Sequence, residues 1–305
     1  MANAFIITVD TEGDNLWRWK KGTPITTENV KFIPRFQELC EKFGFKPVYL
    51  TNYEMAQDDV WVHYIKTKAQ QGLCEIGMHI HAWNSPPEYK IEDSFGGNPY
   101  ITEYPHEVAE EKIKYLTQFL ESRFEIEIVS ARSGRWATND AYFDALKRSG
   151  YVVDCSLTPD IDWSMCPGST VKNGNDYRNI KRNVFMHPSG IIEIPMTSKR
   201  VRHWSDGTFR HKAACIIKGE ELWLRPIKKS LHNLIFLSED VAKEKNGYLE
   251  FMLHSSELMP GGSPYFKSEE DVDVLYNILE KYFTWVSNKG YCGVTLGKYA
   301  QQKIY

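Results

Sequence analysis

Short apolar runs alternate with longer amphipathic stretches along most of the chain. The runs, of about four to eight residues each, predict β-strands, and they are Phe5–Asp10, Lys46–Thr51, Cys74–His81, Ile126–Arg132, Tyr151–Leu157, Ile191–Met196, Leu249–His254 and Cys292–Leu296. The stretches with apolar residues on one face predict helices, and they are Thr27–Gly44, Val60–Gln71, His106–Arg123, Asn139–Ser149 and Ser268–Gly290. This alternation is typical of a parallel sheet covered by helices.

The number of strands favours a barrel of the α/β class over an open sheet. Seven or eight strands in a chain of 305 residues suit a (β/α) barrel. A doubly wound sheet is the alternative, but no GxGxxG sequence follows the first strand. We predict one domain over residues 1–305, with loop insertions near 84–105 and 158–190 and an irregular region near 197–247. That irregular region is expected to hold a hairpin and one helix.

Composition excludes several classes of protein. There are 37 Lys and Arg against 40 Asp and Glu, giving a formal net charge of -3 without a basic cluster, so we expect no nucleic acid partner. No run approaches the roughly 18 apolar residues of a membrane span, and the N-terminus lacks a basic, apolar leader, so we expect a cytoplasmic protein. The six scattered cysteines form no CxxC pair, which predicts reduced thiols and neither a disulfide framework nor a cysteine metal site. The oligomeric state stays open.

Charged and histidine side chains stand at the carboxyl ends of several predicted strands. Because these ends converge on one face of a parallel barrel, we expect the side chains to share one site. Buried charge is costly unless it is paired, so a role in the core explains this convergence poorly. The residues are Asp10, Glu12, His79, His81, Arg132 and His254.

Two pairs of these residues have the spacing that directs both side chains to one side of a strand. Asp10 and Glu12 are separated by one residue, as are His79 and His81, and residues i and i+2 share a face. Two imidazoles and one carboxylate with an open position suit one catalytic divalent metal ion, with zinc the first candidate. The second carboxylate could take a proton from water.

Four motifs, in order along the chain, resemble those of the NodB-type polysaccharide deacetylases, carbohydrate esterase family 4. They are TVDTEGD at 8–14, EIGMHIHAW at 75–83, ARSGRW at 131–136 and MLHSSE at 252–257, where the family usually has TFDD, HxxxH, RxPY and Leu-His. With AWNSPP and HSSELMPGGSPY, the chain is most similar to the branch linked to lipopolysaccharide biosynthesis. The resemblance implies a distorted (β/α)7–8 barrel with long loops at its C-terminal mouth. It also implies metal-dependent removal of an N-acetyl group from an amino sugar.

The resemblance assigns three catalytic residues. The family's base falls on Asp10, the arginine that orients the base falls on Arg132, and the acid that protonates the leaving amine falls on His254.

Two metal ligands depart from the family pattern. The usual carboxylate position is Thr11 here, and the usual second histidine position is Trp83. We therefore expect Glu12 and His81 to take these roles, beside His79 as the first histidine.

Aromatic and charged residues near the mouth are candidates for binding substrate. Trp83 and Trp136 offer apolar ring faces that suit a sugar. Arg135 could bind a phosphate or carboxylate, because a guanidinium group suits bidentate anions. Glu257 could contact substrate or orient His254. A cytoplasmic location then favours a nucleotide- or lipid-linked amino sugar as substrate.

Three other functions fit parts of the pattern. A catalytically inactive barrel could bind sugar or assist assembly, because the usual motif spacings are missing. Another metal-dependent amidohydrolase could use the HxH sequence, although in that class it usually lies on the first strand. A glycosidase could use Asp10 and Glu193, but the histidines would then be unexplained.

Overall fold

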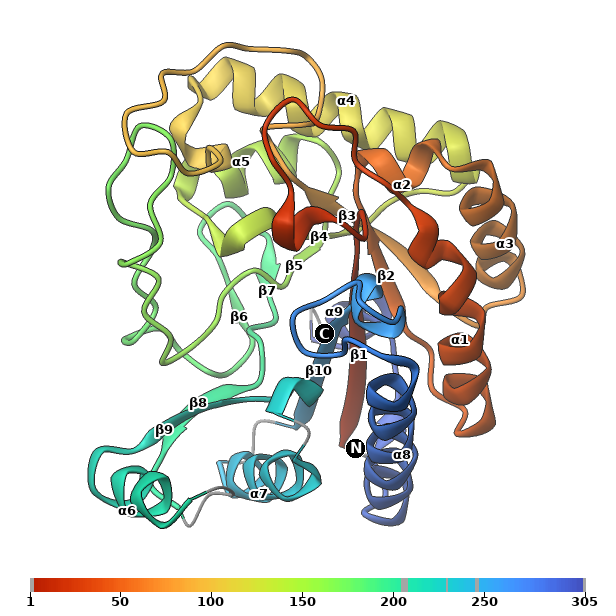
Figure 1. Ribbon diagram of the computed structural model, residues 1–305. Coiled ribbons are helices and arrows are strands. Elements are labelled where there is room, and N and C mark those ends of the chain that lie inside the picture. Colours follow the sequence, from red (N-terminus) through yellow and green to blue (C-terminus); the bar gives the residue numbers. More distant parts are fainter. Residues whose placement is uncertain (1–2, 204–207, 229, 245–246, 304–305) are drawn as a thin grey trace.

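A curled, mainly parallel β-sheet forms the centre of the computed structural model, which describes residues 3–203, 208–228, 230–244 and 247–303 (Figure 1). The strand order is β10-β1-β2-β3-β4-β5-β7-β6, and β11 pairs with β1 beside this path. Every pair is parallel except β6 with β7. The strands are β1 (Ala4–Thr11), β2 (Val48–Thr51), β3 (Glu75–Ile80), β4 (Ser130–Ser133), β5 (Val153–Asp154), β6 (Phe185–Met186), β7 (Ile192–Glu193), β10 (Tyr248–His254) and β11 (Cys292–Gly293). The predicted distorted (β/α) barrel is confirmed, in the form of a half-barrel.

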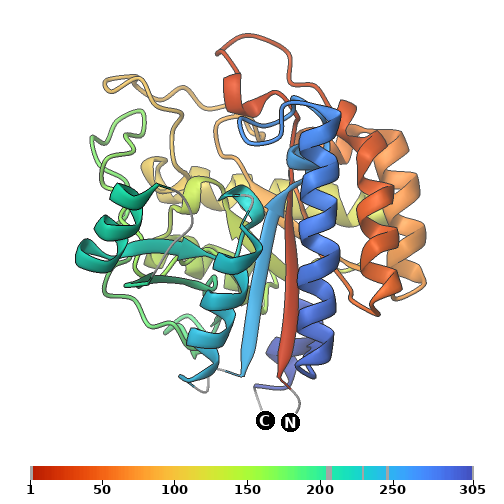
Figure 2. The same cartoon turned by 60° about the horizontal axis from the view of Figure 1, so that its bottom comes forward.

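Helices cover the outer face of this sheet. Figure 2 shows α8 alongside β1, with β10 on the other side of that strand. The α-helices are α1 (Ile33–Lys42), α2 (Tyr53–Gln57), α3 (Asp59–Gln70), α4 (His106–Phe124), α5 (Asp140–Arg148), α6 (Phe209–Lys218), α7 (Leu231–Ala242), α8 (Glu269–Asn288) and α9 (Leu296–Gln301). The 3-10 helices are η1 (Leu16–Arg18), η2 (Glu28–Phe32), η3 (Ile101–Glu103), η4 (Gly134–Trp136), η5 (Pro226–Lys228) and η6 (Ser255–Leu258). Among the described residues, none of these helices has the length and apolar character needed to cross a membrane.

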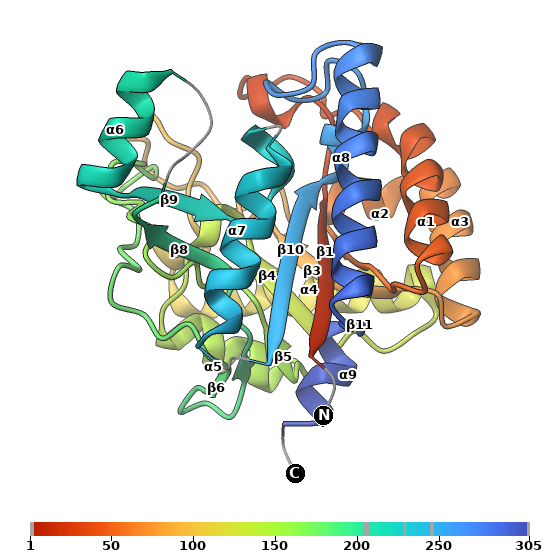
Figure 3. The same cartoon turned by 90° about the horizontal axis from the view of Figure 1, so that it is seen from below.

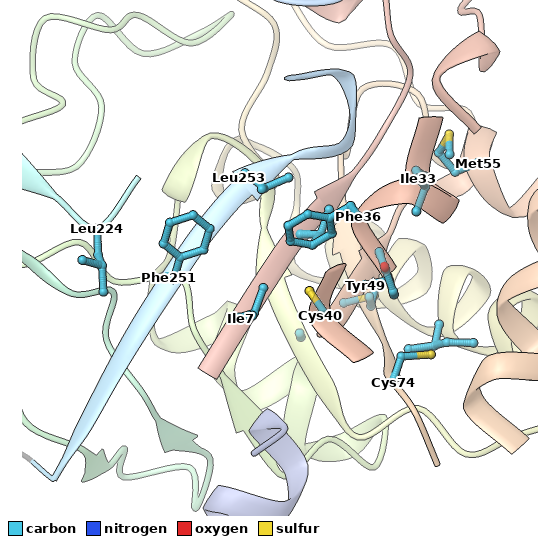
Figure 4. Close-up of a cluster of buried hydrophobic side chains, with 14 of the residues drawn as sticks. Ile7, Ile33, Phe36, Cys40, Tyr49, Met55, Cys74, Leu224, Phe251 and Leu253 are labelled. Atoms are coloured by element: carbon cyan, nitrogen blue, oxygen red, sulfur yellow. The ribbon is translucent and has the colours of Figure 1, made fainter. Parts of the chain in front are cut away.

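The main hydrophobic core lies between the sheet and its helices. All eight residues of β1 are buried, as expected for a central parallel strand covered on both sides. Figure 4 shows Ile7 of β1, Phe251 of β10 and Phe36 of α1 in this layer. A second apolar cluster includes Ile6, which lies on the opposite face of β1. That face also carries Asp10 toward the carboxyl end of the strand, so the apolar interior gives way to polar residues there.

The bounds of several elements differ from the sequence-based expectation. The predicted helix Thr27–Gly44 begins as a 3-10 helix and becomes α-helical at Ile33, because Pro34 is tolerated only in the first turn. The last predicted strand is only Cys292–Gly293, and α9 follows it.

The irregular region near 197–247 holds a hairpin and two helices where one helix was predicted. The strands β8 (Ser198–Val201) and β9 (Glu220–Trp223) form a separate antiparallel sheet. Figure 3 shows this hairpin with α6 at the outer edge of the molecule, while α7 lies beside β10. Residues 204–207, 229 and 245–246 of this region lie outside the described part.

The two predicted loop insertions contact each other. Backbone hydrogen bonds join them, from Ser94 N to Ser169 O at 2.8 Å and from Gly97 N to Gly168 O at 3.1 Å. The carboxylate of Glu103 also accepts hydrogen bonds from the second loop. Both loops leave the carboxyl ends of strands, so together they wall one side of the barrel mouth.

Candidate metal centre and active site

Strand register brings distant polar residues to one place. In the pairing of β1 with β10, Asp10 lies opposite His254, and in the pairing of β3 with β4, His79 lies opposite Arg132. All four positions are at the carboxyl ends of their strands. The predicted convergence of these side chains on the mouth is therefore present.

Glu12, His79 and His81 form a compact group of ligand-type atoms, called the barrel cluster below. Glu12 Oε2 lies 3.4 Å from His79 Nε2 and 3.2 Å from His81 Nε2. All three side chains are buried. Glu12 follows directly after β1, and His81 follows directly after β3. Both side chains therefore lie at the barrel mouth, where His79 also points.

The barrel cluster fits a divalent metal ion. His79 Nδ1 lies 3.2 Å from the carbonyl oxygen of Arg132, and a carbonyl only accepts, so Nδ1 carries the proton. His79 Nε2 faces the carboxylate of Glu12, and although burial opposes it, Asp10 and Glu12 raise the pKa of His79. A metal cation between Nε2 and Glu12 would replace the proton there and hold the two groups together. Burial raises the pKa of Glu12 to about 7, against the lowering effect of His79. Burial also holds the pKa of His81 well below its usual value, so the ring is a neutral ligand.

Asp10 is held by a buried ion pair next to this cluster. Arg132 Nη1 donates to Asp10 Oδ1 at 2.6 Å, and Nη2 donates to Glu250 on β10. Burial opposes ionisation of Asp10, but the charges of Arg132 and His79 outweigh it and hold the pKa of Asp10 well below its usual range. Asp10 is therefore a carboxylate at neutral pH, with its second oxygen unused by Arg132.

His254 is oriented from behind by a residue that the sequence did not indicate. Arg225 Nη2 lies 3.0 Å from His254 Nδ1 and 2.9 Å from Glu257 Oε1. Because arginine only donates, Nδ1 accepts and the ring proton sits on Nε2. This nitrogen lies 3.8 Å from both Asp10 Oδ2 and Glu12 Oε1. Burial and then the charge of Arg225 lower the pKa of His254 to about 3.

Glu257, predicted to contact substrate, lies behind the wall of the site. Its side chain is fully buried, accepting from Arg225 and from the backbone N–H of His254 at 2.9 Å. Its position fits the other predicted role, which was to orient His254.

The ARSGRW motif has an unusual backbone. Arg135 and Trp136 both have positive φ angles, of 58° and 60°, which non-glycine residues adopt rarely. Gly134 precedes them, and a Cβ atom there would lie 2.2 Å from His81 Cδ2. The motif therefore needs glycine at this position so that β4 can approach the barrel cluster closely.

Arg135 binds the loop insertions. Its Nη1 donates to the carbonyl of Asn98 and its Nη2 donates to the carbonyl of Pro167 at 2.8 Å. Its guanidinium carbon also lies 4.2 Å from the centre of the Tyr100 ring. These contacts fix one residue of each insertion beside β4, so the predicted anion-binding side chain already has two acceptors from the protein.

A cavity of about 430 Å³ opens over these residues. Its aromatic wall includes Trp136, which stacks with Trp163 at 6.3 Å between ring centres. Trp83 stacks against His81, and its ring also contacts that of Trp19 at a tilt. The residues predicted from sequence that line this cavity are Asp10, Glu12, His79, His81, Trp83, Arg135, Trp136 and His254.

Sequence reasoning missed two charged residues of the site. Glu250 carried a usable signal, since it interrupts an apolar strand and shares a face with His254 four residues later. Arg225 carried none, because it follows a short strand in the region without periodic pattern.

Comparison with known proteins establishes the class of fold. No family model and no curated protein matches the chain. Solved structures do match, among them a candidate glycoside hydrolase/deacetylase from Parabacteroides distasonis, with a TM-score of 0.62, 10% identity and coverage of 100% of this chain and 72% of that one. A candidate polysaccharide deacetylase from Mycobacterium smegmatis matches with a TM-score of 0.57, 11% identity and coverage of 99% and 91%. A GH57 branching enzyme from Thermococcus kodakaraensis matches with a TM-score of 0.58, 11% identity and coverage of 99% and 71%.

These likenesses, at 10–11% identity, concern the fold alone. The chain has a fold of the kind found in polysaccharide deacetylases, as its motifs implied, and glycoside hydrolases share that fold. Function therefore has to be argued from the site.

Proposed function

We propose that the protein is a metal-dependent hydrolase that removes an N-acyl group, in the first instance N-acetyl, from an amino sugar. The observation that carries this proposal is the barrel cluster directly beside the Asp10–Arg132 pair in one cavity. Hydrolysis of an unactivated amide is helped by a Lewis acid and by a base held close to it. Here His254 Nε2 lies 3.8 Å from Asp10 Oδ2, the base, and 3.8 Å from Oε1 of Glu12, a metal ligand.

Glu12, His79 and His81 would hold the metal ion, with zinc the first candidate for such a donor set. When bound, the ion would polarise the amide carbonyl and make water more acidic. Asp10 accepts the proton of the attacking water on Oδ2, the oxygen that Arg132 leaves unpaired. Arg132 keeps Asp10 ionised and fixes its orientation.

His254 contributes its Nε2–H. Arg225 occupies Nδ1, so the neutral ring donates from Nε2 into the space between Asp10 and Glu12. There it stabilises the developing negative charge and holds the nitrogen of the leaving group close to Asp10. Asp10 then passes the proton that it took from water to the amine as the carbon–nitrogen bond breaks.

The aromatic wall supports a sugar as the acyl carrier. Trp83 and Trp136 line the cavity, and aromatic side chains suit the apolar side of a pyranose. The resemblance to the branch linked to lipopolysaccharide biosynthesis suggests a nucleotide- or lipid-linked sugar as substrate.

The glycosidase alternative has less support. The second carboxylate considered for it, Glu193, is fully buried, accepts from the backbone N–H of Leu157 at 3.0 Å, and does not line the cavity. The carboxylates that do line it, Asp10 and Glu12, come from one strand end and so do not flank a glycosidic bond from opposite sides.

The test is release of free amine from N-acetylhexosamines supplied as monosaccharides, nucleotide-linked sugars and oligosaccharides, with the zinc-loaded chain. We expect turnover of at least one class, abolished in Glu12→Gln and retained in Asp140→Asn, whose carboxylate is 98% exposed. Saturable binding of these sugars without amine release, by a chain that holds zinc, would overturn the proposal in favour of an inactive sugar-binding barrel.

A further inference from the structure

A second group of metal-type ligands lies outside the cavity, at the edge of the molecule. His211 and Cys215 are on α6, and Glu220 is the first residue of β9. We call this group the edge cluster. Figure 3 shows α6 beside the β8–β9 hairpin and away from the barrel.

Local structure brings the three side chains of the edge cluster together. The spacing of four places His211 and Cys215 on one face of the helix. Gly219, with a φ angle of 78°, then reverses the chain, and Glu220 returns toward that face. The ligands therefore come from a single compact turn of chain.

The distances match those around a tetrahedral zinc ion. Cys215 Sγ lies 3.5 Å from His211 Nε2 and 3.4 Å from Glu220 Oε2, and His211 Nε2 lies 3.7 Å from Glu220 Oε1. Bond lengths of about 2.0–2.3 Å and a tetrahedral angle put neighbouring ligand atoms roughly 3.3–3.6 Å apart. The barrel cluster, with separations of 3.2 and 3.4 Å, is slightly tighter.

His203 supports the carboxylate from the other side. It is buried, its Nε2 lies 3.0 Å from Glu220 Oε2, and its ring stacks on Phe236 of α7 at 4.6 Å. A histidine fixed in this way orients a ligating carboxylate, and such supporting contacts are usual around bound metal ions.

We propose that His211, Cys215 and Glu220 bind a second metal ion, zinc, with a structural role and with His203 orienting Glu220. The half-exposed edge at His211 leaves the fourth position to solvent. The ion fastens α6 to β9, and β9 leads two residues further to Arg225 at the active site. Sequence spacing argued against a cysteine metal site, because no CxxC pair exists. The set found here uses one cysteine, so it carries no such signature.

The test counts metal ions in the full-length protein by elemental analysis and is independent of substrate. We expect two equivalents of zinc in the wild type, one in Cys215→Ser and one in His79→Ala. The matched control Cys292→Ser removes an exposed thiol and should keep two. His211→Ala, at a side chain that is 48% exposed, gives a second variant in case Cys215→Ser does not fold, with His106→Ala as its exposed control.

Cobalt(II) gives a second readout that identifies the thiolate. The barrel cluster has no sulfur ligand, so a sulfur-to-cobalt absorption band in the near ultraviolet that depends on Cys215 comes from the edge cluster. The band should persist in His79→Ala and vanish in Cys215→Ser. One equivalent of zinc in the wild type, lost in His79→Ala and kept in Cys215→Ser, with no such band, would overturn the inference and leave the proposed function intact. The converse loss would overturn the proposed metal site and leave this one.

Discussion

The barrel cluster and the edge cluster have similar ligand spacing but opposite surroundings. The barrel cluster stands on the ends of central strands, buried beside an ion pair and under a cavity of about 430 Å³. The edge cluster joins a surface helix to a hairpin, and its His211 is half exposed. Interligand distance can thus indicate where a metal ion binds but not what it does. The neighbouring groups decide between a catalytic and a structural role. The barrel cluster has a base and a cavity beside it, whereas the edge cluster joins α6 to β9.

Replacing the base should have the largest effect and should separate catalysis from metal binding. Asp10→Asn is expected to lower kcat/KM by about 10²–10⁴-fold, the usual contribution of a general base. Its zinc content should stay at the wild-type value, because Asp10 is a neighbour of the barrel cluster and not a member. Steady-state kinetics with elemental analysis checks this, and Asp140→Asn serves as the exposed control. Loss of zinc together with activity would make Asp10 a ligand and not a base.

Replacing the buried Arg132 should lower the free energy of unfolding more than replacing an arginine on the surface. Arg132→Met leaves Asp10 and Glu250 as buried, unpaired carboxylates, which should cost about 3–5 kcal/mol in the free energy of unfolding. Arg148→Met is the matched control, since Arg148 pairs with Glu110 on the surface at 2.7 Å and should cost at most about 1 kcal/mol. Denaturant unfolding measures both. Equal costs would mean that the buried network contributes no more than a surface pair.

A side chain at position 134 should displace His81 and weaken metal binding at the barrel cluster, without affecting the edge cluster. In Gly134→Ala the new Cβ would lie 2.2 Å from His81 Cδ2, so the ring must move away from Glu12. We expect zinc affinity of the barrel cluster to fall by about 10–100-fold, as when the support of a ligand is altered. Competition with a chelator measures this, and the edge cluster of the same molecule is the internal control. An unchanged affinity would remove His81 from the ligand set.

The sequence predicted the barrel cluster and missed the edge cluster for a physical reason. Apolar runs indicate the strands, and the carboxyl ends of parallel strands meet at one mouth of the barrel. Asp10 and His79 could therefore be placed together from the sequence alone. The region near 197–247 has no such periodicity, and one of its two α-helices went unpredicted. Whether the whole chain is one domain stays a prediction.

The sequence analysis also missed the charged residues that pair with the buried groups of the site. Glu250 could have been found, because a carboxylate within an apolar strand needs a counterion nearby. Arg225 reaches His254 across a loop, and only the folded chain brings the two together.

Titration of Glu250 should give a smaller, pH-dependent effect on stability. Burial raises its pKa from 4.5 to about 7 although Arg132 opposes this, so between these values the folded state binds more protons than the unfolded state. Stability from this group is therefore lost as the pH rises from 4.5 to 7. Glu250→Gln removes that contribution, so the wild type should lose stability relative to the variant over this range. Unfolding curves at several pH values check it, and a constant difference would contradict the assignment.

The smallest expected effect concerns the aromatic surface beside the barrel cluster. The Trp19 ring lies at a tilt against the Trp83 ring, 4.5 Å between centres, and both residues line an adjoining cavity of about 620 Å³. If a second sugar or a carrier group extends into it, Trp19→Ala should raise KM by about 2–10-fold, the equivalent of about 0.5–1.5 kcal/mol for an aromatic contact, with kcat unchanged. A simple N-acetyl monosaccharide should not detect the change, because it reaches only the cavity above Asp10. Equal increases for short and extended substrates would mean that Trp19 acts by holding Trp83 against His81, which would make it a support of the metal site and not a part of the substrate surface.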